Sequence, residues 1–227
     1  MKAVILAAGM GTRLGGQSPK PLTKLVNGET ILQRQINALL NYLDKKDIYI
    51  VVGYKKEMIM DKFPNYNFIE NPFYKETNTS KSLLSALNQI NETNDVLWLN
   101  GDVVFEKNIL NAIVKFSYSC MAVNSSPVFD EEIKYNLNDD GTISQVSKII
   151  TDGLGEAVGI NKIIGTHLSE FKNYLNECED NDYFERGIEL YINKGFKIYP
   201  IDITKYYCNE IDDEKDLKNV NININKI

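Results

Sequence analysis

The first 25 residues place the strongest constraint on the fold of this chain. Residues 2–8 form a short, mostly apolar run that leads directly into the glycine-rich turn Gly9-Met10-Gly11. An apolar run of this length, bounded by glycine, is typical of a parallel strand that is buried on both faces. The sequence therefore predicts an N-terminal strand with a glycine-rich loop at its carboxyl end, where open α/β sheets bind ligands.

The loop after this strand has the composition of an anion-binding site. Glycine lets the backbone approach a ligand closely, so that several N–H groups can converge on it. Arg13 and Lys20 add positive charge, and Lys20 lies between two prolines that restrict the backbone on both sides. Backbone donors and two cations together suit a nucleoside triphosphate.

Two better-known phosphate loops fit this stretch less well. A P-loop is excluded because no Gly-Lys-Ser/Thr closes the motif. A dinucleotide fingerprint is matched by Gly9 and Gly11 only, because Leu14 occupies the third glycine position and the loop runs on to a proline. The remaining interpretation without a ligand is an ordinary strand and turn with surface charges.

The complete string Leu-Ala-Ala-Gly-x-Gly-Thr-Arg-Leu, followed by Pro-Lys-Pro-Leu, resembles the signature of nucleotidyltransferases that make activated sugars and alcohols. The resemblance implies a Rossmann-like three-layer α/β sandwich. It also implies that Lys20 holds the α-phosphate and that Arg13 grips the leaving pyrophosphate, since phosphoryl chemistry needs cations more than a nucleophile. The nucleotide contacts implied in this way are Leu6, Ala7, Ala8, Gly9, Gly11, Thr12 and Gly101.

Hydrophobic periodicity predicts strands that alternate with helices over most of the chain. The predicted strands are 2–8, 47–52, 66–69, 95–99, 120–123, 155–160 and 196–201, and the predicted helices are one from Thr30, then 55–62, 80–90, 106–116, 167–177, 183–194 and one from Asp213. Residues 134–138 and 142–149 flank an Asn-Asp-Asp-Gly turn and predict a hairpin. The alternating tail, 219–225, is typical of an edge strand or a frayed end.

This order predicts one α/β domain with a mostly parallel central sheet and a small β-hairpin in its acceptor-binding region. A length of 227 residues and an apolar share of 43% suit a single domain over 1–227. Within it, we expect residues 1–124 to form the nucleotide-binding half and residues 125–227 the acceptor-binding half.

Charge and cysteine content limit the partners and the compartment. A net charge of −6 argues against a nucleic-acid partner. The three cysteines lack metal-ligand spacing and suggest idle thiols in a reducing cytosol, so we expect a cytoplasmic protein. The N-terminal apolar run is too short to insert in a membrane. The oligomeric state stays open, a homodimer included.

Two acidic loops offer ligands for a divalent cation, which would be held by oxygens. Asp102 follows the predicted strand 95–99, and the second loop reads Glu210-Ile211-Asp212-Asp213. Asp213 could instead cap the last helix, which leaves Asp212 free. In the family that the chain resembles, aspartates in these two motifs bind Mg²⁺, which implies Asp102 and Asp212 as the metal ligands.

The segment 71–83 concerns the choice of base. Hexose-1-phosphate uridylyl- and thymidylyltransferases carry a Gln and a Gly-Thr pattern here, and this chain has neither. Its Asn-Pro-x-Tyr, Thr-Asn and Ser-Leu elements resemble the phosphocholine and phosphonate cytidylyltransferase branch. That resemblance implies that Asn78 and Ser82 face the base of CTP, since an amide and a hydroxyl can read cytosine. Alternatively, Asn78 is part of the loop structure and Ser82 lies in the first helical turn.

Three elements of the second half are similar to the same branch. The resemblance implies that Lys148 neutralises the acceptor phosphate and that Glu156 and Glu185 contact a cationic or hydroxylated acceptor. Alternatively, either glutamate is a structural charge at a strand edge or in a first helical turn, which fits the sequence equally well. The chain departs from the family where a tryptophan usually precedes Glu-Ile-Asp, because Tyr207-Cys208-Asn209 stands there instead.

These features predict a cytidylyltransferase that condenses CTP with a small phosphorylated or phosphonylated compound, using Mg²⁺ and direct in-line attack. Phosphocholine, 2-aminoethylphosphonate, a polyol phosphate and a phosphorylated amide all remain open as acceptors, and the product would serve capsule or surface-polymer synthesis. The alternatives are a hexose-1-phosphate nucleotidyltransferase that uses UTP, dTTP or GTP, a non-catalytic nucleotide sensor and, less well matched, a nicotinamide dehydrogenase.

Overall fold

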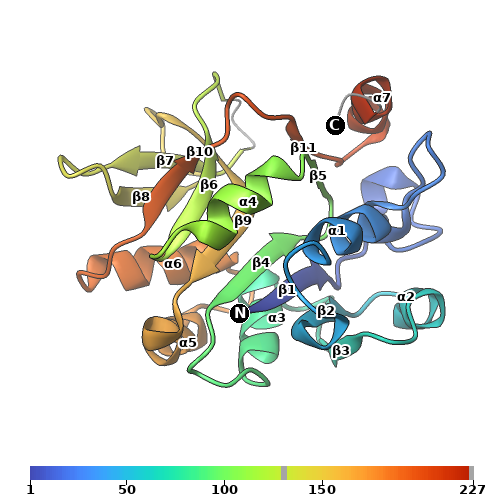
Figure 1. The fold of residues 1–227 in the computed structure, drawn as a ribbon, viewed down its shortest axis with the longest axis horizontal. Coiled ribbons are helices and arrows are strands. Elements are labelled where there is room, and N and C mark those ends of the chain that lie inside the picture. The colour runs from blue at the N-terminus through green and yellow to red at the C-terminus, as the bar shows by residue number, and fades with distance from the viewer. Residues whose placement is uncertain (129–131, 225–227) are drawn as a thin grey trace.

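The computed structural model describes residues 1–128 and 132–224 and is built on a twisted central sheet. Its strands lie in the order β10-β6-β9-β4-β1-β2-β3 (Figure 1). Their bounds are β1 Lys2–Ala7, β2 Ile48–Val52, β3 Asn67–Glu70, β4 Val96–Asn100, β6 Cys120–Asn124, β9 Gly155–Ile163 and β10 Tyr199–Asp202.

Strand direction divides the sheet at β9. β1 pairs in parallel with both β2 and β4, and β2 pairs in parallel with β3. β9 runs antiparallel to β4 on one side and to β6 on the other, and β10 returns parallel to β6. Strands from both halves of the chain therefore share one sheet, and the predicted single α/β domain with a mostly parallel sheet is confirmed.

Alternate residues of β1 enter two separate hydrophobic cores, which explains why its sequence is apolar on both faces. Val4 and Leu6 pack in one core with the helices α3 (Thr79–Leu87), α5 (Leu168–Glu177) and α6 (Phe184–Asn193). Ala3, Ile5 and Ala7 pack in the other core with the helices α1 (Ile31–Leu39), α2 (Lys56–Lys62) and α4 (Asn108–Lys115). The result is the expected three-layer sandwich.

Two small β structures flank the sheet. β7 (Lys134–Leu137) and β8 (Ile143–Ser147) form the predicted hairpin, and β7 also pairs with β9. Gly141 in the turn has φ = 78°, the left-handed region that favours glycine. β5 (Val103–Phe105) and β11 (Cys208–Glu210) form a separate antiparallel pair, which joins the chain after β4 to the C-terminal region.

The C-terminal segment corrects one sequence prediction. Residues 219–223 belong to helix α7 (Glu214–Asn223), so an edge strand or frayed end is wrong for them, and residue 225 lies outside the described residues. Val220 packs against Leu25 and Ile31, and Val26 N donates to Asn221 Oδ1 at 2.8 Å. α7 is therefore held beside the loop that follows β1 (Figure 1).

Other differences concern short elements without periodicity. β5 and β11 were not predicted, because three-residue strands are too short to show alternation. Four 3₁₀ turns within the two described ranges were also unpredicted: Thr12–Leu14, Lys20–Leu22, Lys45–Asp47 and Gly165–His167. The first two lie within the glycine-rich loop and give it a defined conformation.

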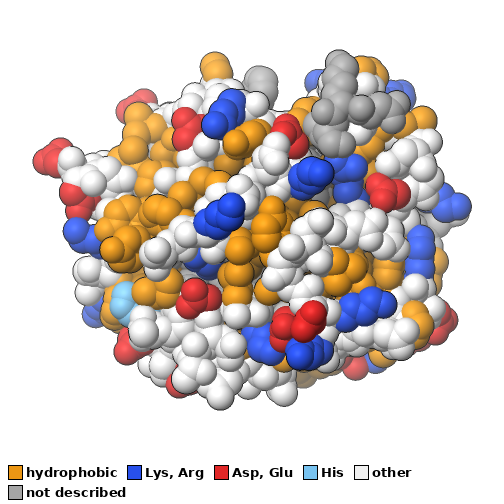
Figure 2. All heavy atoms as spheres, viewed as in Figure 1, with side chains coloured by type: hydrophobic (Ala, Val, Ile, Leu, Met, Phe, Trp, Pro, Cys, Tyr) orange, Lys and Arg blue, Asp and Glu red, His pale blue; other side chains and the backbone are white. Residues whose placement is uncertain are grey.

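The surface carries charged side chains of both signs, and the cysteines, all within the part of the chain that the structure describes, form no disulfide. On the face drawn in Figure 2, cationic and acidic side chains are interspersed and form no broad basic area. Cys120, Cys178 and Cys208 are free thiols, the first two buried. In the two described ranges, no helix is both long and apolar enough to cross a bilayer.

Candidate active site

A polar cavity of about 640 Å³ opens at the carboxyl ends of β1 and β4. Leu6, Ala8 and Gly9 line it from the end of β1, and Gly101 and Asp102 line it from the end of β4. Gly101 is needed at this position, because a Cβ there would lie 2.4 Å from the Leu6 carbonyl oxygen. The cavity thus occupies the place where the sequence predicts a ligand.

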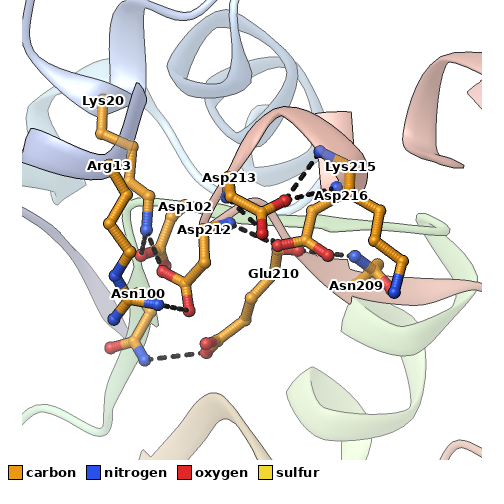
Figure 3. A network of polar contacts seen from close by, with 10 residues as sticks. All are labelled: Arg13, Lys20, Asn100, Asp102, Asn209, Glu210, Asp212, Asp213, Lys215 and Asp216. Carbon is orange, nitrogen blue, oxygen red and sulfur yellow. Dashed lines mark hydrogen bonds and ion pairs between the residues drawn. The ribbon is translucent and has the colours of Figure 1, made fainter. Parts of the chain in front are cut away.

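Lys20 forms the centre of the polar cluster at one end of this cavity (Figure 3). Its Nζ donates to Asp102 Oδ2 at 2.7 Å and to Asp212 Oδ1 at 2.5 Å. Arg13 Nη1 lies 3.5 Å from Asp212 Oδ2, with its side chain 63% exposed. Four residues from three distant parts of the sequence therefore meet at one point.

The backbone around Lys20 explains how its side chain reaches the two aspartates. Pro19 is extended, with φ = −53° and ψ = 136°, and the chain then turns into the 3₁₀ segment Lys20–Leu22. Gly11 packs on the lysine stem, because a Cβ at Gly11 would lie 2.7 Å from Lys20 Cβ. Gly11 also has φ = 58°. Its absent side chain and left-handed backbone are thus both required to seat Lys20.

The two aspartates are held together through the β5–β11 pair. Ile211 N donates to the Asp102 carbonyl oxygen at 3.1 Å, which places Asp212 next to Asp102. Asp213 caps α7 by accepting from Lys215 N and Asp216 N, and Asp216 completes a capping box. The expectation that Asp213 serves as a helix cap is confirmed, and the Asp212 carboxylate is left to face the cavity.

The cluster stabilises its own charged states. Burial alone would lower the pKa of the Lys20 ammonium, but the combined attraction and hydrogen bonds of Asp102 and Asp212 outweigh it and raise the pKa. Burial likewise opposes ionisation of Asp212, yet Lys20 and Arg13 hold the pKa of this carboxyl below its usual value. Lys20 and Asp212 are therefore both charged at neutral pH.

The chemistry of this cluster fits a divalent cation that prefers oxygen ligands. Asp102 Oδ1 is buried and has no hydrogen-bond partner among the described residues. Asp102 and Asp212 approach one another closely enough to share the Lys20 ammonium. Two converging carboxylates, one with an unsatisfied oxygen, are what Mg²⁺ with triphosphate oxygens requires.

The segment after β3 forms a second wall of the cavity, which Asn78 and Ser82 both line. Asn78 is the N-cap of α3 and accepts from Thr79 N at 2.8 Å, while Ser82 lies in the first turn and is 6% exposed. Asn78 and Ser82 therefore do have the local structural roles that the sequence offered as the alternative to base contact. These roles do not exclude contact with a ligand. Ser82 Oγ accepts from Asn71 Nδ2 at 2.9 Å.

The far end of the cavity is acidic. Lys148 Nζ lies 4.8 Å from the centre of the Tyr183 ring, beside Glu185 and Glu156. Glu185 is 5% exposed, and its Oε2 has no partner among the described residues. Burial raises the pKa of Glu185 to about 7, and burial together with the charge of Glu132 raises the pKa of Glu156 to about 7.

Glu210 lies between this acidic end and the Lys20 cluster, because its charge interacts with both Asp102 and Glu156, and it was not singled out from the sequence. It accepts from Asn100 Nδ2 at 3.3 Å (Figure 3). Burial, followed by the charges of Asp102 and Glu156, raises the pKa of Glu210 well above its usual value. Its place in the Glu-Ile-Asp motif was a signal that could have identified it. Glu132 also lines the cavity, but its loop carries no periodic or motif signal.

The structure separates the residues predicted from the sequence into three groups. Leu6, Ala8, Gly9, Arg13, Asn78, Ser82, Gly101, Asp102, Lys148, Glu156, Glu185 and Asp212 line the cavity. Lys20 does not line it but contacts two residues that do. Ala7, Gly11 and Thr12 lie outside the lining: Ala7 packs in the core with α1, Gly11 seats Lys20, and Thr12 begins a 3₁₀ turn.

Comparison with known proteins identifies the family. Residues 3–133, more than half of the chain, match the model of the MobA-like NTP transferase domain. The chain therefore belongs to this family of nucleotidyltransferases.

Curated relatives share the N-terminal half. The chain is 40% identical over 118 residues to the bifunctional protein GlmU of Methanococcus maripaludis strain C7, covering 50% of this chain and 28% of that protein. It is 31% identical over 137 residues to CMP-5'-(3-aminopropyl)phosphonate synthase of Streptomyces rubellomurinus, covering 56% of this chain and 21% of that protein. The match thus spans about a quarter of the length of these relatives.

Solved structures share the fold over nearly the whole chain. CTP:phosphocholine cytidylyltransferase of Streptococcus pneumoniae superimposes with a TM-score of 0.78 at 19% identity, covering 98% of each chain. Inositol-1-phosphate CTP transferase of T. maritima gives a TM-score of 0.77 at 17% identity, covering 95% of this chain and 90% of the other. At these identities the likeness establishes the Rossmann-like nucleotidyltransferase fold and not the substrate.

Proposed function

We propose that this protein is a cytidylyltransferase that joins CTP to a small phosphorylated or phosphonylated acceptor and releases pyrophosphate. The observation that carries the proposal is the contact of the Lys20 ammonium with both Asp102 and Asp212, at the edge of a cavity large enough for a nucleotide and a small acceptor. A protein that only binds nucleotide has less need of this combination of cation and carboxylates.

The chain's own residues divide the work of phosphoryl transfer by charge. Lys20 would hold the α-phosphate and neutralise the charge that develops on it during attack. Arg13, exposed at the mouth of the cavity, would hold the leaving pyrophosphate. Asp102 and Asp212 would hold Mg²⁺, which supplies charge neutralisation to the triphosphate when bound. The acceptor phosphate would attack in line, without a covalent intermediate on the protein.

Ser82 and Asn78 support CTP as the nucleotide. Both line the cavity on the α3 side, and a hydroxyl and an amide can read the edge of a pyrimidine. The solved structures with the same fold include two CTP-dependent transferases, although they share less than 20% identity with this chain. The backbone of Leu6, Ala8, Gly9 and Gly101 would surround the nucleotide from the β1 and β4 side.

The acidic far end of the cavity supports an acceptor that carries a cationic or hydroxyl-bearing group. Lys148 is the cation at this end that would neutralise the acceptor phosphate. Glu156 and Glu185 line the same end and would face the remainder of the acceptor. Phosphocholine, 2-aminoethylphosphonate, a polyol phosphate and a phosphorylated amide all have this combination of one anionic and one cationic or polar end.

The test is release of pyrophosphate from CTP and Mg²⁺ in the presence of each of these acceptors, with UTP, dTTP, GTP and ATP as competing nucleotides. We expect release with CTP and at least one acceptor, and no release without acceptor. No pyrophosphate with any pairing of nucleotide and acceptor would contradict the proposal.

A hexose-1-phosphate nucleotidyltransferase that uses UTP, dTTP or GTP is the second candidate function. One observation favours it: the fold also superimposes, with a TM-score of 0.79 at 15% identity, on a Bacillus anthracis protein whose assignment as a glucose-1-phosphate thymidylyltransferase is provisional. Adding glucose 1-phosphate and N-acetylglucosamine 1-phosphate to the same panel separates the two functions.

A further inference from the structure

Asn71 lies behind the cavity wall that carries Ser82 and does not itself line the cavity. It follows β3, is 4% exposed, and is anchored by its backbone N–H, which donates to the Val52 carbonyl oxygen at 2.8 Å. Its side chain makes three hydrogen bonds, to Phe73, Thr77 and Ser82. A buried amide that is this fully bonded has a fixed orientation.

Obligate donors and acceptors determine which way the Asn71 amide faces. The Phe73 backbone N–H can only donate, and it lies 3.0 Å from Asn71 Oδ1. The amide nitrogen must then face the other side, where it lies 3.0 Å from Thr77 Oγ1 and 2.9 Å from Ser82 Oγ. Both hydroxyl oxygens therefore accept from Asn71.

The same reasoning places the two hydroxyl protons. Thr77 Oγ1 lies 2.8 Å from the Phe73 carbonyl oxygen, which can only accept, so the Thr77 proton points there. Ser82 Oγ has no acceptor among the described residues, so its proton is left for a ligand in the cavity. Thr77 keeps one lone pair and offers only an acceptor, whereas Ser82 keeps its proton and one lone pair.

Asn78 adds a second donor on the same wall. Its Oδ1 is used by Thr79 N, and its Nδ2 has one N–H directed at the Asn181 carbonyl oxygen at 3.3 Å. The amide therefore retains one N–H for a ligand. The wall as a whole presents an acceptor and two donors.

This pattern matches one pyrimidine and mismatches the others. Cytosine presents an amine donor at N4 and acceptors at N3 and O2, whereas uracil and thymine present an acceptor at O4 and a donor at N3. The Ser82 hydroxyl can donate to cytosine N3. Beside the N3–H of uracil or thymine it could only accept, which would leave its own buried proton without a partner. We infer that Asn71 is a positioning residue that selects cytosine: it offers Ser82 Oγ a donor and no acceptor, and so leaves the Ser82 hydroxyl proton for the base. The inference rests on the proposed use of CTP and extends it to a residue outside the cavity.

Replacing the amide by an isosteric carboxylate tests the inference. In Asn71→Asp the carboxylate can only accept, so Ser82 would turn its proton toward residue 71 and present only lone pairs to the cavity. The Kd values of CTP and UTP, measured by calorimetry with Mg²⁺ and no acceptor, report the preference without requiring turnover. We expect the wild-type protein to prefer CTP, and the preference to fall by about tenfold or more in the variant. Asn41→Asp, an exposed amide with the same change of charge, should leave the ratio unchanged.

Each outcome decides the inference. A wild-type preference for CTP that survives Asn71→Asp would overturn the role of Asn71 while leaving the proposed function intact. Equal affinity for CTP and UTP in the wild type would overturn the role and the choice of base together. If the variant does not fold, Ser82→Ala replaces it and should bring the ratio toward one; an unchanged ratio would overturn the inference. Failure of pyrophosphate release with CTP bound would count against the proposed function alone.

Discussion

The two ends of the cavity handle buried charge in opposite ways. At the nucleotide end, the Lys20 ammonium is paired with Asp102 and Asp212 at 2.7 and 2.5 Å without a ligand, and Asp102 Oδ1 alone keeps no partner among their described contacts. At the acceptor end, Glu156 and Glu185 form no ion pair within the described part of the chain, and burial raises the pKa of each. The Lys20 ion pairs of the first end form before any ligand binds, whereas the carboxyl groups of the second end have no ion-pair partner among the described residues until a ligand supplies one.

This contrast suggests how a shared fold can serve different acceptors. In the proposed function the paired end performs a step common to all nucleotidyl transfer, so its geometry can be fixed in the protein. The unpaired end holds carboxyl groups whose charge depends on pH and on what binds beside them. Changes at the first end should therefore affect turnover, and changes at the second should affect acceptor choice and pH dependence.

The largest expected effect comes from removing the central cation. Lys20→Ala should lower kcat by about 10³-fold, because the charge on the transferred phosphate loses its main stabilising group. The assay is pyrophosphate release under saturating CTP and acceptor. Lys24→Ala, an exposed lysine in the same loop, is the matched control and should retain wild-type turnover. Equal loss in both variants would show that general loop charge matters and not the Lys20 contact.

The second effect tests the unpaired end through pH. The folded-state pKa of Glu185, about 7, lies above its ordinary value of 4.5, so the folded protein retains a proton that the unfolded chain has lost. Stability is therefore expected to fall as pH rises from 4.5 through 7, by about 3 kcal/mol from this group. Glu185→Gln should remove that part of the pH dependence.

Urea unfolding at pH 5 and pH 8, without ligand, measures this difference between wild type and variant. Glu156 and Glu210 contribute in the same direction in both proteins, so the comparison isolates Glu185. Glu76→Gln, an exposed carboxyl, should leave the pH dependence as in the wild type. Parallel pH profiles for wild type and Glu185→Gln would contradict the account of the acceptor end.

A smaller effect distinguishes the adjacent aspartates 212 and 213. Asp212→Asn should raise the Mg²⁺ concentration needed for half-maximal turnover by at least about tenfold, because one of two carboxylate ligands is lost. Titrating Mg²⁺ at fixed CTP checks this. An unchanged Mg²⁺ requirement would show that Asp212 is not a ligand of the metal.

The smallest effect belongs to its neighbour. Asp213→Ala removes the N-cap of α7 and should lower the free energy of unfolding by about 1 kcal/mol, or 2–4 °C in Tm. The Mg²⁺ requirement at 20 °C should stay that of the wild type. A shifted Mg²⁺ requirement in this variant, rather than in Asp212→Asn, would exchange the roles of the two residues.

The fold could be predicted because its main elements are long and periodic. β1 is apolar on both faces because alternate residues enter different cores, and a continuous apolar run can be recognised in the sequence alone. The three-residue strands β5 and β11 have no such pattern, and their pairing joins positions about 105 residues apart. The tail was misread because its alternation of Asn with Val and Ile indicates a strand, whereas packing of Val220 against Leu25 favours a helix.

The nucleotide end of the site was more predictable than the acceptor end for a similar reason. Lys20, Asp102 and Asp212 stand in compact motifs, so the sequence could indicate that they meet. Glu132 lies in a loop without a pattern, and Asn71 acts through two hydroxyls whose proton positions follow only from three-dimensional contacts. No one-dimensional signal reports the direction of a hydroxyl proton.

Transfer of label from CTP tests the central claim most directly. CTP labelled at the α-phosphorus is incubated with Mg²⁺, the acceptor panel and either wild-type protein or Lys20→Ala. The account predicts that the label moves to a small CMP-linked product in the wild-type reaction, that none becomes attached to protein, and that Lys20→Ala makes about a thousandfold less product. Label bound to the protein, or equal product from both proteins, would contradict it.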